Sequence, residues 1–200
     1  MDTSKLNSFV ETEWANKAFP ALCDFIKIEN MSPDYDQDWY LNKKLIKAVN
    51  YLKDFGDNYG IKGYKSEIIG NTLKPKKNTD DPDVYYPPLL FITVEPSNTK
   101  IQQSILLYGH CDKQPPNNGW DEDKFPYNPV VVNDRLYGRG SSDDGYATFV
   151  ALLSIKAIQQ QGLDHPRFYI VVEAEEESSS PNLIYFIKQL YESVNFKFYF

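Results

Sequence analysis

The first residues that suggest chemistry are a histidine and a carboxylate that follow an apolar run. His110 and Asp112 stand two positions apart, directly after the predicted strand at residues 105–108. A histidine can bind a metal through one ring nitrogen while a carboxylate holds the other ring N–H, which fixes the tautomer and raises ligand basicity. The alternative is a polar turn at a strand end, so this pair indicates a metal site only in combination with other residues.

A second segment, residues 137–145, places two glycines, two serines and two aspartates just before a predicted helix. Glycine permits tight backbone, and aspartate is also an ordinary residue at a helix N-terminus. Capping accounts for one of Asp143 and Asp144 and less easily for both, whereas a rigidly held carboxylate could bridge two cations. The segment lacks the lysine and the spacing of a phosphate-binding loop, which argues against nucleotide binding.

The third segment is a run of glutamates directly after the predicted strand at residues 168–172. Such a run is usually a solvated charged surface. Here it follows a strand apolar enough to be central, where like charges crowd unless a cation neutralises them. One glutamate would then bind the metal and a neighbour would accept a proton from water. The pattern alone does not choose among Glu175, Glu176 and Glu177.

Hydrophobic periodicity predicts the elements that position these segments. Helices are predicted for residues 6–28 (divided at Pro20), 39–55 (ending at Gly56), 143–161 and 182–191. Strands are predicted for residues 89–94, 105–108, 168–172 and 196–200, with a polar, exposed excursion at residues 70–88. Alternating strands and helices predict an α/β domain with a mostly parallel sheet flanked by helices. In such sheets ligands gather beyond the carboxyl ends of the strands, where the three segments fall.

Composition limits the partners of the chain. The 200 residues carry a formal charge of −7 without a basic stripe, which argues against nucleic acid. No window reaches the roughly 18 apolar residues of a membrane span, and the N-terminus does not resemble a signal peptide, so we expect no membrane partner and a cytoplasmic location. Cys23 and Cys111 are far apart, so we expect free thiols.

Three motifs in order, LLYGHCD, LYGRGSSDD and EAEEESSS, resemble the di-zinc metallopeptidases. This family includes carnosinase-like dipeptidases, glutamate carboxypeptidase, aminoacylase and succinyl-diaminopimelate desuccinylase. The resemblance spans residues 104–190. It implies the zinc-peptidase (phosphorylase/hydrolase-like) catalytic fold and metal-dependent hydrolysis of a peptide or amide bond in a small peptide or acyl-amino acid, most closely as a dipeptidase.

Carried over residue by residue, the resemblance makes His110 a ligand of one zinc and Asp112 its partner. Asp143 would bridge two zinc ions, for which manganese or cobalt could substitute. Glu177 would bind the second ion, and Glu176 would be the general base. Where many members have Asp-Asp-Lys-Gly, this chain has a glycine in place of the lysine, so the local turn is expected to differ.

The resemblance also predicts that residues 1–200 are the N-terminal part of a metallopeptidase catalytic domain. Family members supply a further aspartate after the strand corresponding to residues 196–200, and a later histidine. They also have a lid and dimerisation domain, which we expect to be absent here. An incomplete site predicts little activity for this chain alone. The alternatives are a non-catalytic remnant with weak or no metal binding, or an acidic interaction module, which would leave the three motifs unexplained.

Overall fold

The computed structural model describes residues 2–75, 80 and 83–194 and shows a layered α/β fold. Its helical segments are α1 (Thr3–Glu13), the π-helical η1 (Trp14–Ala18), α2 (Phe19–Ile26), α3 (Trp39–Asn42), α4 (Lys44–Asn58), α5 (Tyr146–Gln160), the 3-10 turn η2 (Glu176–Ser178) and α6 (Leu183–Val194). Its strands are β1 (Tyr64–Leu73), β2 (Tyr85–Val94), β3 (Ser104–His110), β4 (Val130–Val132), β5 (Arg135–Tyr137) and β6 (Arg167–Glu173).

The main sheet has the strand order β1-β2-β6-β3. Strands β3 and β6 pair in parallel, with His110 opposite Glu173, whereas β2 pairs antiparallel with both of its neighbours. Strands β1, β6 and β3 therefore run in one direction and β2 runs against them. The predicted α/β class is confirmed, and the sheet is mixed because of this one reversed strand.

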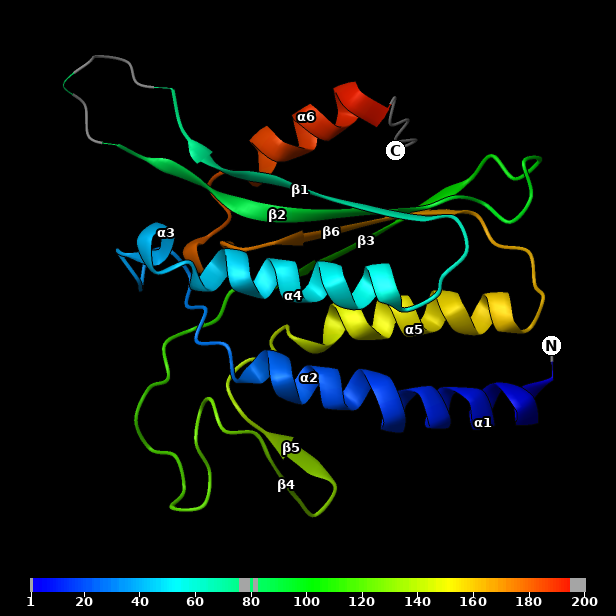
Figure 1. The fold of residues 1–200 in the computed structure, drawn as a ribbon, viewed down its shortest axis with the longest axis horizontal. Coiled ribbons are helices and arrows are strands. Elements are labelled where there is room, and N and C mark those ends of the chain that lie inside the picture. Colours follow the sequence, from blue (N-terminus) through cyan, green and yellow to red (C-terminus); the bar gives the residue numbers. More distant parts are fainter. Residues whose placement is uncertain (1, 76–79, 81–82, 195–200) are drawn as a thin grey trace.

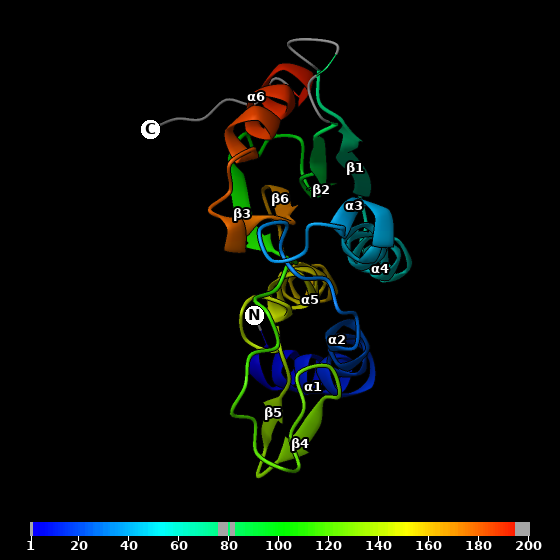
Figure 2. The same cartoon turned by 90° about the vertical axis from the view of Figure 1, so that its left-hand side faces the viewer.

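Helices cover the sheet on both faces (Figures 1 and 2). Along β6, Phe168 and Ile170 belong to the core shared with α2, α4 and α5, while Tyr169 and Val171 belong to the core beneath α6. This alternation follows from the two-residue period of a strand. A strand buried on both faces reads as a continuous apolar run, which is why the sequence revealed β6 clearly.

The segment at residues 70–88 differs from its prediction as an exposed excursion. Strand β1 runs to Leu73 and β2 begins at Tyr85, so both ends of that segment are strand. The two proline residues at its end lie within β2 and are buried. Strand β1 was not predicted because its side chains are mostly exposed or half-buried, which leaves no apolar run. The predicted strand at 196–200 lies outside the described residues.

Two predicted helices are interrupted at identifiable positions. Pro20 falls in the first turn of α2, where its missing N–H is tolerated, and the π-helical η1 directly precedes that helix. The predicted helix at residues 39–55 is two helices, because Lys43 adopts a left-handed conformation with φ 62° between α3 and α4. Helix α4 then continues through Gly56 to Asn58.

A short hairpin, β4–β5, was missed by the sequence analysis. Its turn residues Asn133 and Asp134 both have positive φ, 50° and 59°, as the tight turn of a two-residue hairpin requires. The strands have only three residues each, too few for a periodic pattern. The hairpin leads directly into the loop that carries Asp143.

In the described part of the chain, no helix has the length and apolar character needed to cross a membrane. Cys23 and Cys111 are both free, as predicted.

Replacing Phe149 with alanine should lower the free energy of unfolding by about 3–5 kcal/mol. Phe149 is fully buried on α5 and meets the rings of Phe25 and Phe55 edge-on. Urea unfolding followed by circular dichroism measures the change. Val150→Ala on the exposed side of the same helix is the control and should change stability by no more than about 0.5 kcal/mol. Equal losses in the two variants would contradict this account of the core.

Candidate metal centre

The three segments singled out from the sequence meet beyond the carboxyl ends of β3 and β6. His110 ends β3 and Glu173 ends β6, and the two residues are direct neighbours across the parallel pair. One ligand atom from each of His110, Asp143 and Glu177 lies within 4.8 Å of the others. A ring nitrogen and two carboxylate oxygens are a donor set that zinc and related divalent metals accept.

His110 is held with one ring nitrogen facing the cluster. Its Nδ1 lies 3.1 Å from the backbone oxygen of Asp112 and 3.4 Å from that residue's carboxylate. Its Nε2 lies 3.0 Å from Asp143 Oδ1 and 3.7 Å from Glu176 Oε2. A proton on Nδ1 donated to Asp112 leaves Nε2 free to bind a metal.

The carboxylate of Asp112 reaches beyond the histidine. It is fully buried and accepts the backbone N–H groups of Glu176 and Glu177, at 3.1 and 3.0 Å. The sequence suggested only that Asp112 orients the His110 ring. The structure shows that it also fastens the glutamate turn η2 to the end of β3.

Serine residues support the same turn from its other side. Ser178, the last residue of η2, has its hydroxyl 2.5 Å from that of Ser32 and accepts the N–H of Asp34 at 3.0 Å. The turn is therefore held by two segments that are distant from it in the sequence.

The loop before α5 carries Asp143 and Asp144. Helix α5 begins at Tyr146 with Gly145 as its N-cap residue and no side-chain capping bond, so capping does not explain the two aspartates. Asp144 accepts the backbone N–H of His110 at 3.3 Å, whereas the side chain of Asp143 is 72% exposed. A Cβ at Gly145 would lie 2.2 Å from the oxygen of Gly140, so this turn has no room for a side chain at that position.

The neighbouring glutamates have different surroundings. Glu175 is buried and accepts both the backbone and side-chain N–H groups of Asn182, at 2.8 and 2.7 Å. Glu173 accepts the hydroxyls of Tyr108 and Ser180. These two residues are committed to structural contacts, which leaves Glu176 and Glu177 at the cluster.

Glu177 and Glu176 differ in how they are held. Glu177 accepts a hydrogen bond from the side-chain amide of Gln114 at 2.5 Å. The side chain of Glu176 is 41% exposed, with its carboxylate near His110. Sequence analysis missed Gln114 because a single glutamine in a loop carries no recognisable pattern.

The cluster has an excess of negative charge. Burial raises the pKa of Glu177, and the charge of Asp143 adds to the shift although the bond from Gln114 opposes it. Burial lowers the pKa of His110, but its contacts with Asp112, Asp143 and Glu176 outweigh burial and raise the pKa to about 10. A divalent cation among these groups would relieve the crowding, so the residues fit a metal.

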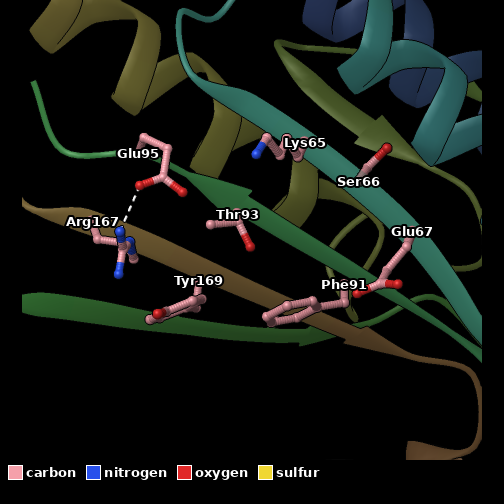
Figure 3. Close-up of a pocket in the computed structure, with 8 residues that line it drawn as sticks. All are labelled: Lys65, Ser66, Glu67, Phe91, Thr93, Glu95, Arg167 and Tyr169. Carbon is pink, nitrogen blue, oxygen red and sulfur yellow. Dashed lines mark hydrogen bonds and ion pairs between the residues drawn. The ribbon is translucent and has the colours of Figure 1, made fainter. Parts of the chain in front are cut away.

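A separate hollow of about 490 Å³ lies on the sheet, away from the cluster (Figure 3). Arg167 and Glu95 form an ion pair of 2.6 Å at its rim, and Phe91 and Tyr169 contribute aromatic rings. Arg167 begins β6, whereas Glu173 ends it, so the hollow and the cluster lie at opposite ends of that strand. None of the three cluster residues lines the hollow.

A histidine and carboxylates gathered beyond two parallel strands define an α/β protein with a candidate metal site at the edge of its sheet. Residues 106–200 match the model of Peptidase family M20/M25/M40. This match confirms the resemblance predicted from the three motifs.

Several of the proteins that this chain resembles are named as dipeptidases. The Cys-Gly metallodipeptidase DUG1 of Candida albicans is 28% identical over 154 residues, which cover 76% of this chain and 31% of that protein. The structure of the di-peptidase Dug1p from Saccharomyces cerevisiae matches with a TM-score of 0.72 at 23% identity, covering 92% of this chain and 37% of that one. The structure of human carnosine dipeptidase 1 matches with a TM-score of 0.69 at 19% identity, covering 95% of this chain and 38% of that one. The structural matches show a shared fold, and the chain spans about a third of the length of these relatives.

Gln114→Ala should weaken zinc binding about ten- to a hundredfold, because loss of a hydrogen bond to a ligand typically has this effect. Isothermal titration calorimetry measures the affinity. Gln102→Ala is the matched control, since the side chain of Gln102 bonds only a neighbouring backbone oxygen on the exposed surface. Unchanged zinc affinity in Gln114→Ala would mean either that Glu177 does not bind the metal or that Gln114 does not hold Glu177 in place.

Zinc binding should strengthen as the pH rises from about 6 to about 8, by about tenfold per pH unit for each proton that the metal displaces. The sign follows from the raised pKa of His110, about 10, which keeps the ring protonated in the metal-free chain at neutral pH. Competition with a chromophoric chelator at several pH values measures the slope. His165→Gln should retain the slope and His110→Ala should reduce it. A pH-independent affinity would contradict metal binding by His110.

Proposed function

We propose that this chain is part of a zinc-dependent peptidase that hydrolyses dipeptides. The observation that carries the proposal is the convergence of His110, Asp143 and Glu177 within 4.8 Å, with the carboxylate of Glu176 beside them. The dipeptidase relatives support small peptides as substrates, and the Cys-Gly dipeptide is the first to test because DUG1 is named for it.

In this proposal three residues bind the metal and a fourth, Glu176, transfers a proton. His110, Asp143 and Glu177 would hold zinc, and Asp143 would be the shared ligand if two ions were bound. A bound zinc would supply a Lewis acid for the scissile carbonyl and for the attacking water. Glu176 takes the proton from that water and passes it to the leaving nitrogen, the role of a general base within reach of the reacting atoms.

The surroundings of Glu176 suit a base better than those of its neighbours. Its side chain is 41% exposed and its carboxylate lies 3.7 Å from His110 Nε2, so a water and a substrate can approach it. Glu175 is occupied by Asn182, and Glu177 is fixed by Gln114. Asp112 acts indirectly, because it positions both His110 and the turn that carries Glu176.

The test uses the chain extended at its C-terminus by the corresponding downstream part of Candida albicans DUG1. Glu176→Gln should lower kcat for Cys-Gly hydrolysis by at least about a hundredfold, the usual contribution of a general base, with nearly unchanged zinc content. Glu177→Gln should lower zinc content, measured by atomic emission on the purified protein. Glu67→Gln, on β1, is the control and should alter neither quantity.

The opposite pattern would mean that the roles of Glu176 and Glu177 are exchanged. Full activity in Glu176→Gln would defeat its assignment as the base. A chimera that is folded and loaded with zinc but inactive would count against dipeptidase function and leave the metal site standing.

A further inference from the structure

Lys113 is buried in the interior of the protein, directly after Asp112 and three residues after His110. It has no exposed surface, and its amino group donates to the carbonyls of Phe25, Ile26 and Ile28 at 3.0, 3.2 and 2.6 Å. Helix α2 ends at Ile26, so these oxygens include carbonyls that a helix end leaves without partners. Lys113 therefore caps the C-terminus of α2.

The number of N–H donors at this helix end depends on the protonation state of Lys113. Burial lowers the pKa of Lys113 to about 7. A protonated amino group has one N–H for each of the three carbonyls and also meets the negative end of the helix dipole, whereas a neutral one can donate to two of them. The capping contact thus depends on the length and donors of the side chain.

The stem of Lys113 also supports the loop that carries Asp143. A Cβ added at Gly140 would lie 2.7 Å from Cε of Lys113, so the lysine stem lies directly against that glycine. Gly140 has φ +82° and accepts the N–H of Gly145 at 3.0 Å, which closes the loop around Asp143. A Cβ at Gly145 would in turn lie 2.9 Å from the ring of Phe25.

Both ends of the Asp143 loop therefore pack against two residues, Lys113 and Phe25, that contact each other. Gly140 rests on Lys113 and Gly145 rests on Phe25, while the amino group of Lys113 bonds the carbonyl of Phe25 and lies 4.4 Å from its ring centroid. Any movement of the end of α2 would move the support of the loop.

We infer that Lys113 is a positioning residue of the metal site, which joins the end of α2 to the loop of Asp143 and so sets where that carboxylate lies. This inference rests on the proposed metal site for its effect on zinc. The contact between Lys113 and the loop is testable without metal.

Lys113→Met keeps the apolar stem and removes the donors, so it isolates the amino group. We expect zinc affinity to fall at least about tenfold, as for other residues that orient a metal ligand. The visible spectrum of the cobalt-substituted protein should also change, because the ligand geometry around the metal is altered. Lys113→Gln keeps a donor on a shorter side chain and should lose less zinc affinity. It replaces Lys113→Met in the test if the methionine variant does not fold.

Two controls separate positioning from general stability. Lys156→Met removes a lysine that is paired with Glu13 at 2.9 Å, outside the cluster, and should leave zinc affinity unchanged. Leu190→Ala truncates the core beneath α6 and should lower stability while it retains the cobalt spectrum. Wild-type zinc affinity and cobalt spectrum in the folded Lys113 variants would overturn the inference, as would equal losses of zinc affinity in Leu190→Ala.

A metal-free measurement keeps this inference distinct from the proposed function. The N–H of Gly145, bonded to Gly140, should exchange with deuterium faster in the Lys113 variants than in Lys156→Met, as followed by NMR. If the wild-type chain bound no zinc, the metal site would fail, and unchanged Gly145 exchange would independently overturn the role of Lys113.

Discussion

The buried carboxylate of Asp112 is the interaction on which the arrangement of the site depends. A buried charge is costly unless hydrogen bonds compensate it, and here two backbone N–H groups of the glutamate turn do so. Displacing the turn would leave both the carboxylate and those N–H groups without partners. Glu176 and Glu177 are therefore held in place by a residue that lies two positions beyond the end of β3.

That constraint also explains how adjacent glutamates can coexist in one short segment. The sharp turn after β6 separates their side chains, and each buried carboxylate has donors of its own. Tyr108 and Ser180 serve Glu173, and Asn182 serves Glu175. Only the last two glutamates are directed to the cluster, where negative charge accumulates around His110. The segment contains four glutamates, but only the carboxylates of Glu176 and Glu177 are placed to bind or act beside a metal.

The sequence predicted the fold class, the buried central strand β6, the edge strand β3 and the three segments that meet at the sheet edge, because both strands contain continuous apolar runs. It did not predict β1 or the β4–β5 hairpin, whose half-exposed or very short strands carry weak ones. It also could not separate Glu175 from its neighbours, since that distinction depends on Asn182 and Gln114, which lie in other segments. The metal roles of His110, Asp143 and Glu177 stay predictions supported by their proximity.

The site is assembled almost entirely from contacts between segments distant in sequence. Ser32 meets Ser178, and the side chain of Asn30 donates to the backbone oxygen of Cys111 at 2.6 Å. Such contacts form only once the parallel pair β3–β6 and the helices on it are in place, since closing long loops costs entropy that local structure does not recover. Metal affinity should consequently be coupled to the folding of the whole domain, because ligands held apart in the unfolded chain gain nothing from the cation until they are brought together. The carboxylates oppose one another in that final step, and a bound cation turns the same charges from a source of repulsion into a source of stability.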